Sequence, residues 1–161
     1  LTTSSAASDV YKRQVGGFSN SDVLGSAKGW AGTIKYNEKA KQTIEQFFAR
    51  PDTLSLGVCN GCQLFIELGL LHLTANEKPK MDHNDSGKFE CIFTDVVIEE
   101  SPAIMLNSLQ GSRLGIWAAH GEGKFIFPKD KSNYAIAGKY AYDSYPSNPN
   151  GSDHNLSLIH I

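Results

Sequence analysis

A Gly-x-Cys-x-Gly turn between an apolar run and a helix-type pattern is the feature that most constrains this 161-residue chain. The apolar run covers residues 54–58, the turn is Gly57-Val-Cys59-Asn-Gly61, and apolar residues recur at helical spacing over residues 63–71. A strand, a tight glycine turn and a helix in direct succession lift a nucleophile above a sheet. The glycines let strand and helix approach each other, and the helix N-terminus favours a thiolate. The sequence therefore predicts Cys59 as a nucleophile on an α/β scaffold.

Two hexapeptides near the chain ends are predicted to be sequencing-adapter residues. Codons for Asp-Val-Tyr-Lys-Arg-Gln at residues 9–14 can be chosen so that their reverse complement translates as Leu-Ser-Leu-Ile-His-Ile, the sequence of residues 156–161. Such a pair is typical of an adapter read through in frame on both sides of an insert, so neither hexapeptide is expected to belong to the natural domain. We expect residues 1–14 and 156–161 to be artefact and residues 15–155 to be a partial domain, truncated at both ends.

Composition excludes several classes of protein. The chain has 15 Lys and Arg against 17 Asp and Glu, so it lacks the basic footprint of nucleic-acid or membrane-surface binding. No apolar run reaches the length of a membrane span, and no secretory signal is recognisable. Three cysteines, two of them in one turn, do not make a disulfide framework. We expect one cytoplasmic globular domain with no nucleic-acid or membrane partner.

Periodicity along the chain predicts an α/β fold. A helix over residues 37–50, a strand over residues 54–58 buried on both faces, and a helix over residues 63–71 form the doubly wound pattern with a parallel sheet. Residues 23–33 are predicted as a loop or a poor helix. Further along, a loop is predicted over residues 78–88, a strand over 89–98, a short helix over 101–110 and a strand over 113–119. Residues 124–127 and 134–142 are predicted as two paired hairpin strands.

Cys59 and Cys62 also form a C-x-x-C, which suits a thiol–disulfide pair or half of a zinc site. Zinc requires two further ligands, and the remaining candidates show no second motif at ligand spacing: Cys91, His72, His83 and His120. No metal site is therefore predicted. The redox interpretation stays open, although it leaves Gly57 and Gln63 without a purpose.

A hydrolytic cysteine needs a base, and no histidine of this chain is obviously that base. His120 is the best placed, because it ends a predicted strand and precedes Gly-Glu-Gly, and strand ends face the ligand crevice in open α/β sheets. The glycine pair at residues 16–17 fits either a loop that offers N–H groups to an anion or an ordinary turn.

Four blocks of residues carry a family resemblance: Gly16-Gly-Phe-Ser, Gly57-Val-Cys-Asn-Gly-Cys-Gln63, Ala119-His-Gly-Glu-Gly123 and Tyr145-Pro-Ser-Asn-Pro-Asn-Gly-Ser152. In this order they resemble the class I (triad) glutamine amidotransferase domains at the C-terminal end of phosphoribosylformylglycinamidine synthases. The resemblance covers residues 15–155. It implies the doubly wound, flavodoxin-like fold of that type, with a mostly parallel sheet.

The resemblance also implies a chemistry. A cysteine attacks the side-chain amide of glutamine and releases ammonia, and water resolves the glutamyl thioester. The implied site consists of the catalytic Cys59, oxyanion-binding N–H groups of Asn60 and of the loop Gly16, Gly17 and Phe18, and the substrate-binding Gln63 and His120.

The implied partners are glutamine and a synthetase domain, in the same chain or in a separate subunit, that receives the ammonia. That domain uses ATP and Mg²⁺ in purine synthesis, and this domain needs no cofactor. The chain departs from the family at Asn20-Ser21, where Tyr-Gly is common, and the His-Pro-Glu block of the triad would follow Asn155. We therefore expect the fragment to be inactive alone. The alternatives are a thiol–disulfide protein and a non-catalytic interaction domain.

Overall fold

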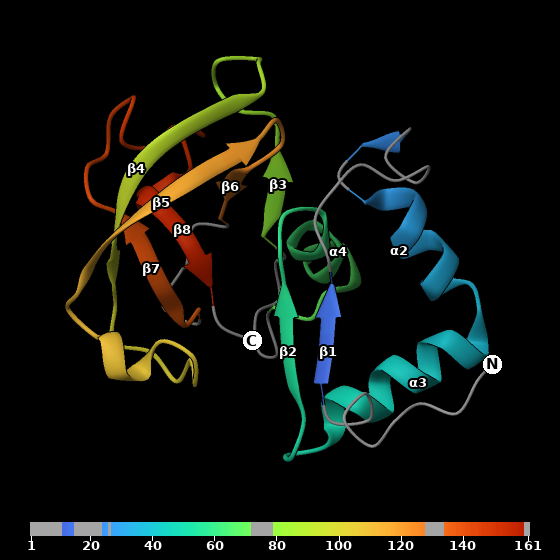
Figure 1. The fold of residues 1–161 in the computed structure, drawn as a ribbon. Helices are drawn as coiled ribbons and strands as arrows, with labels where there is room; N and C mark the ends of the chain where they lie inside the picture. Colours follow the sequence, from blue (N-terminus) through green and yellow to red (C-terminus); the bar gives the residue numbers. More distant parts are fainter. Residues whose placement is uncertain (1–10, 15–23, 26, 72–78, 128–133, 160–161) are drawn as a thin grey trace. The chain divides into compact units, whose positions relative to one another are not determined.

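The computed structural model describes residues 11–14, 24–25, 27–71, 79–127 and 134–159 (Figure 1). The chain divides into two compact units, Leu1–Leu68 and Gly69–Ile161. Within the described residues, no helix is both long and apolar enough to cross a membrane.

The first unit pairs two short parallel strands with three helices. Strand β1 (Tyr11–Gln14) runs parallel to β2 (Leu54–Gly57), and the helices are α2 (Lys28–Lys35), α3 (Glu38–Ala49) and α4 (Asn60–Leu68). Helix α3 begins as predicted, because the Asn37 side chain accepts a hydrogen bond from the N–H of Ala40 at 3.1 Å. It ends before Pro51, which disfavours the helical region in the preceding residue.

Helices α2 and α4 share the core of this unit. The buried residues Ala27, Ala31 and Leu64 form a cluster against which Trp30, Ile34 and Leu68 pack. Of the two alternatives predicted for residues 23–33, a loop or a poor helix, the structure has a helix in the second half. Glycine lowers helix propensity, but the apolar stripe of α2 has α4 to pack against, and that packing outweighs the cost of Gly29 and Gly32.

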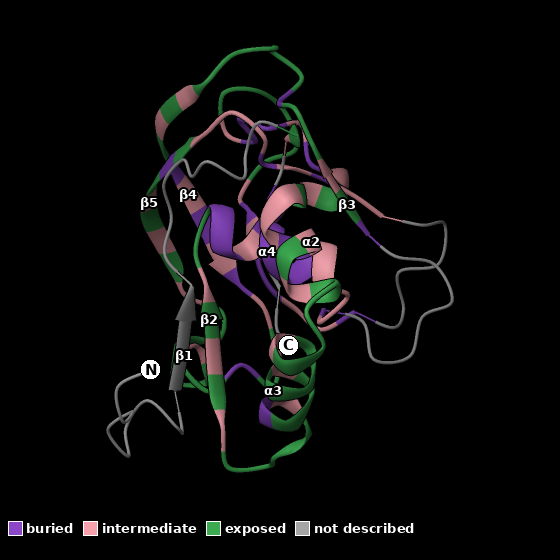
Figure 2. Cartoon of the chain, turned by 90° about the vertical axis from the view of Figure 1, so that its right-hand side faces the viewer, coloured by how far each residue is buried: buried purple, intermediate pink, exposed green. Residues whose placement is uncertain are grey.

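Strand β2 is half-buried on one face and exposed on the other, contrary to the prediction of burial on both faces. Gly57 faces the Phe65 ring of α4, whereas Leu54, Leu56 and Val58 point the other way and are 39%, 37% and 45% exposed. Figure 2 shows the contrast between the partly exposed β2 and the largely buried α4. An apolar run shows that a strand is hydrophobic. It does not show whether one or both faces of the strand are covered by other described elements.

The second unit is built on antiparallel strands. A four-stranded sheet has the order β5-β4-β7-β8, with β4 at Glu90–Ile98, β5 at Arg113–His120, β7 at Ile136–Tyr140 and β8 at Leu156–Ile159. A two-stranded antiparallel sheet joins β3 (Lys80–Asp82) to β6 (Lys124–Ile126). A core cluster of the second unit consists of Val96, Ile98 and Tyr140, with Leu106, Leu114 and Ile116 packed on it.

The predicted mostly parallel sheet is not confirmed. Among the described strands only β1 and β2 run parallel, so the chain is a mixed α/β protein. The link between β4 and β5 contains only the 3₁₀ turn Asn107–Leu109, not the predicted short helix, and a parallel pair would need a longer crossover.

Two predictions about short strands are wrong. Residues 124–127 and 134–142 do not pair with each other, since β6 pairs with β3 and β7 lies between β4 and β8. Strand β3 lies inside the predicted loop over residues 78–88. The two hexapeptides supply β1 and β8, and a second 3₁₀ turn, Asp153–Asn155, precedes β8. A backbone conformation does not test the origin of codons, so the adapter assignment stays a prediction.

Candidate active site

The turn between β2 and α4 is a sharp elbow with Cys59 at its tip. Cys59 has φ 53°, in the left-handed region that costs a residue with a side chain about 1–2 kcal/mol. Its carbonyl accepts hydrogen bonds from the N–H groups of Cys62 at 2.9 Å and Gln63 at 3.1 Å, which starts the helix at once. The predicted order of strand, turn and helix is confirmed. Backbone strain of this kind gathers at functional sites, and a nucleophile elbow has such a turn.

Gly57 is the residue that makes the close approach of strand and helix possible. A Cβ at this position would lie 2.7 and 2.8 Å from two Phe65 ring carbons and 2.9 Å from the carbonyl oxygen of Gly61. Carbon atoms prefer a separation of about 3.5–4.0 Å, so a side chain here must push the helix away from the strand. The glycine is therefore required by packing, since the Gly57 backbone is not itself in the left-handed region.

Replacing Gly57 by alanine is expected to lower the free energy of unfolding by about 1–3 kcal/mol, as overpacking does. The control is Gly32→Ala on α2, where the nearest neighbour of a new Cβ is a Tyr36 ring carbon at 4.0 Å. Removing glycine from an open helix position stabilises by about 0.5–1 kcal/mol. Urea unfolding of the two variants should therefore shift in opposite directions, and equal midpoints would contradict this account of Gly57.

The two cysteines of the elbow differ in their surroundings. Cys59 is exposed, whereas burial, and secondarily the neighbouring Cys59, raises the pKa of the Cys62 thiol to about 12. Cys62 therefore stays protonated at neutral pH and is a poor nucleophile. Cys91, in the second unit, is exposed. Within the described ranges, no three His, Cys, Asp or Glu side chains lie close enough to hold a metal ion.

Two further predicted site residues lie on the first turn of α4. Asn60 is the first residue of the helix, with its N–H next to Cys59, and it is 3% exposed. Gln63 follows one turn later and is 8% exposed. The other predicted oxyanion residues, Gly16, Gly17 and Phe18, lie outside the described residues. The structure thus brings Cys59, Asn60 and Gln63 together at one helix terminus.

His120 belongs to the second unit, where it ends β5 and opens the turn to Gly123. Burial lowers the pKa of its imidazole, so the ring is neutral at neutral pH. The ring lies against Gly123, at the place that a Cβ of residue 123 would occupy. This close approach requires glycine at that position.

The turn from His120 to Gly123 is held by buried side chains to which the sequence analysis gave no individual role. The Asn84 side chain donates to the carbonyl oxygens of His120 at 2.6 Å and Lys88 at 2.9 Å, and accepts from the N–H of Gly123 at 3.3 Å. The Gly123 carbonyl accepts from Asn150 at 2.9 Å and Ser152 at 3.2 Å. Asn84, Asn150 and Ser152 therefore fix the position of this turn.

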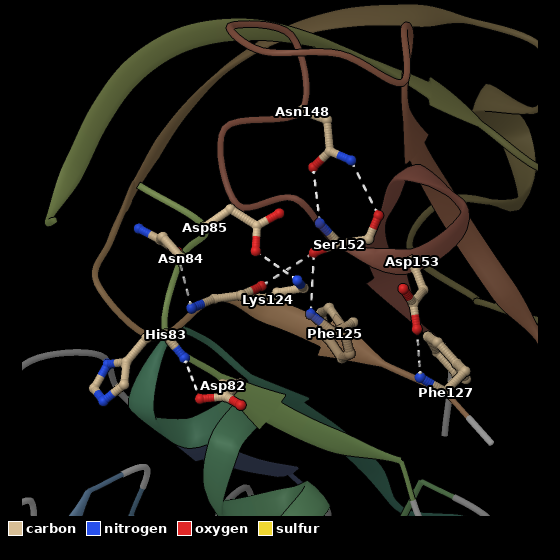
Figure 3. A network of polar contacts seen from close by, with 11 residues as sticks. Asp82, His83, Asn84, Asp85, Lys124, Phe125, Phe127, Asn148, Ser152 and Asp153 are labelled. Carbon is tan, nitrogen blue, oxygen red and sulfur yellow. Dashed lines mark hydrogen bonds and ion pairs between the residues drawn. The ribbon is translucent and has the colours of Figure 1, made fainter. Parts of the chain in front are cut away.

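The segment that supplies Asn150 and Ser152 is itself cross-linked. Asn148 donates to the Ser152 carbonyl at 3.0 Å and accepts from the Ser152 N–H at 3.1 Å. The Ser152 hydroxyl accepts from the N–H of Phe125 at 3.0 Å. Figure 3 shows these bonds beside the ion pair between Lys124 and Asp85, at 2.5 Å. The sequence suggested only turns here, although a dense set of Asn, Asp and Ser also suits side-chain capping of backbone groups.

Comparison with known proteins adds a family to this geometry. Residues 11–160 match the model of the CobB/CobQ-like glutamine amidotransferase domain. The chain is 44% identical over 163 residues to the probable phosphoribosylformylglycinamidine synthase, chloroplastic/mitochondrial, of Arabidopsis thaliana, and 39% identical over 171 residues to the Homo sapiens phosphoribosylformylglycinamidine synthase. Each alignment covers 90% of this chain but only 12% or 13% of the relative.

A solved structure agrees in fold. The structure described as "Structure of PurLQS from Thermotoga maritima" is similar with a TM-score of 0.73 and 29% identity. The alignment covers 92% of this chain and 61% of that chain.

Proposed function

Because the chain belongs to the CobB/CobQ-like glutamine amidotransferase family, we propose that it is the glutaminase part of a phosphoribosylformylglycinamidine synthase. The observation that carries the proposal is the exposed Cys59, held at φ 53° between β2 and α4. A nucleophile must project from its turn and have a donor beside it, and the elbow meets both conditions. For the complete domain we also propose the doubly wound sheet, with β2 as one of its parallel strands.

The proposed reaction begins when the Cys59 thiolate attacks the side-chain amide carbon of glutamine. The carbonyl oxygen becomes an oxyanion, which the N–H of Asn60 and an N–H from the loop Gly16, Gly17 and Phe18 stabilise; such donors contribute a few kcal/mol each. The C–N bond then breaks, and the nitrogen takes up a proton and leaves as ammonia. Water then attacks the resulting thioester, which releases glutamate and restores the free thiol of Cys59.

Two further residues are proposed to bind glutamine. Gln63 lies one turn along α4 from the nucleophile and can offer an amide group to the substrate amide. His120, with its neutral imidazole, can donate or accept one hydrogen bond without adding charge. We propose no cofactor for this domain.

The ammonia is proposed to pass to a synthetase domain, in the same chain or in a separate subunit, that uses ATP and Mg²⁺. That domain would convert formylglycinamide ribonucleotide to its amidine. A cytoplasmic location remains part of the proposal, although the name of the Arabidopsis relative gives chloroplastic/mitochondrial. No nucleic acid or membrane is proposed as a partner.

Labelling with diazo-oxo-norleucine, an electrophilic glutamine analogue, tests the proposal in the whole enzyme. We expect modification of Cys59 alone, suppressed by excess glutamine. Cys62 should not react, because burial raises the pKa of its thiol to about 12 and keeps it protonated. The Cys59→Ser enzyme is the control, because it should take up no glutamine-sensitive label. No glutamine-sensitive label on Cys59 would refute the proposal and favour a non-catalytic interaction domain.

A further inference from the structure

One face of the β4–β5 ribbon carries apolar side chains that no described element covers. Side chains alternate along both strands: Thr94, Val96, Ile98 and Ala118 point inward and are buried. The opposite set contains the charged residues Asp95 and Arg113 toward one end, and its exposed residues on the rest of the face are uncharged. We call these uncharged residues the outer β4–β5 face, and they are Cys91, Phe93, Gly115, Trp117 and Ala119.

The strand pairing places these residues side by side. Cys91 lies opposite Ala119, and Phe93 lies opposite Trp117. At one end the face is bounded by charge, where Asp95 and Arg113 approach each other at 3.8 Å. An apolar centre with a charged rim is the anatomy of a protein interface. Strand β5 also ends the order of the described sheet, so the face reaches a sheet edge (Figure 1).

Two aromatic rings dominate the outer β4–β5 face. Phe93 is 59% and Trp117 68% exposed, with ring centroids 5.5 Å apart. The Phe93 ring leans over Gly115, where a Cβ would meet it at 2.5 Å. The glycine therefore lets the ring lie flat on the strand. The two rings sit on paired strands rather than on a loop, so little side-chain freedom remains to be lost on binding.

Cross-strand pairing alone does not account for this surface. An aromatic pair stabilises a sheet whether or not its outer side is covered. A contiguous apolar patch at a rigid sheet marks an interaction site, and tryptophan is enriched among the residues that dominate binding. The surface therefore suits a partner that offers an uncharged pocket for the indole and an acceptor for its N–H.

The proportions of the relatives indicate the occupant. The chain aligns over 90% of its own length but 12% of the Arabidopsis relative, so most of such an enzyme lies outside this domain. Ammonia that passes between two active sites must be kept from solvent, which requires the domains to be docked. We propose that the outer β4–β5 face docks onto the synthetase part of the same enzyme. This inference deepens the proposed function and rests on it.

Photo-cross-linking from the centre of the face tests the inference. In the whole enzyme, Trp117→p-benzoylphenylalanine keeps an aromatic side chain at the exposed position. We expect the cross-linked peptides to come from the synthetase part. Cross-links confined to this domain, or to a second copy in a mixture of isotopically light and heavy enzyme, would overturn it.

A functional measurement uses side chains that can be removed without disturbing a core. Trp117→Ser and Phe93→Ser in the whole enzyme are expected to lower glutamine-dependent product formation at least about tenfold, with glutamine hydrolysis and ammonia-dependent formation retained. Alkylation of Cys91 should accelerate by a similar factor. Met105→Ser is the matched control, since Met105 is 70% exposed in the link between β4 and β5. The inference would be overturned if the Trp117 and Phe93 variants showed the wild-type rate of glutamine-dependent product formation and the wild-type rate of Cys91 alkylation.

The two proposals fail separately. If a Cys59→Ser enzyme still uses glutamine, the proposed function is wrong whatever the cross-links show. If Cys59→Ser abolishes glutamine use while Trp117 cross-links only within this domain, the docking inference alone is wrong.

Discussion

A Cys59→Ser enzyme is expected to lose glutamine-dependent product formation by about ten-thousand-fold or more while retaining ammonia-dependent formation. Removal of a catalytic nucleophile has effects of this size, because hydroxyl in place of thiolate leaves the site without a reactive group. Externally supplied ammonia bypasses the glutaminase step altogether. Steady-state kinetics of the whole synthase, with glutamine or an ammonium salt as the nitrogen source, measure the two activities separately.

Cys62→Ser is the matched control, with the same chemical change three residues along α4. The Cys62 thiol is buried and protonated, so its replacement should change the glutamine-dependent rate by no more than a few-fold. If the chain were a thiol–disulfide protein, Cys59→Ser and Cys62→Ser would each abolish its activity, because both cysteines form the redox pair. Equal and large losses in Cys59→Ser and Cys62→Ser would therefore support the redox alternative.

The elbow could be predicted from sequence because its determinants are local. Gly57, Cys59 and Gly61 stand within five residues, and each acts on its immediate neighbours. Helix α3 was predictable for the same reason, since Asn37 caps it and Pro51 follows its end. The left-handed backbone conformation of Cys59 could not be predicted from its residue type.

The sheets were not predictable in the same way, because pairing joins distant segments. Strands β6 and β7 are close in sequence, but β6 pairs with β3 and β7 with β4 and β8. Alternation identifies a strand and leaves its partner open. The prediction of a mostly parallel sheet assumed that the second half of the chain continues the strand–helix pattern of the first half. The short link between β4 and β5 instead favours antiparallel pairing.

The support of His120 was missed because it comes from polar loops. Asn84 lies in a stretch that suggests only turns, yet it is 2% exposed and bonds three backbone groups. Asn150 and Ser152 come from another such stretch. Buried backbone groups need partners, and a turn between strands has few of its own. Burial, which the sequence does not reveal for an asparagine, distinguishes these residues from ordinary turn formers.

Asn84→Ala is expected to accelerate local hydrogen exchange in the turn at Gly123 about a hundredfold. The substitution leaves the Gly123 N–H and the carbonyls of His120 and Lys88 without this partner, and each buried unsatisfied group costs about 1–3 kcal/mol. A local loss of about 3 kcal/mol corresponds to that factor in the opening equilibrium. Mass spectrometry of peptides that span residues 119–126 in the whole enzyme measures the effect at the site itself.

Asn107→Ala is the control for this change, because Asn107 is exposed in the 3₁₀ turn before β5. A surface substitution of this kind is usually within about 0.5 kcal/mol of neutral, so exchange near Gly123 should stay at the wild-type rate. If His120 also binds glutamine, the Asn84 variant should raise the KM for glutamine more than it lowers kcat. Faster exchange with unchanged kinetics would leave Asn84 as a support of the turn alone, and unchanged exchange would contradict the supporting role itself.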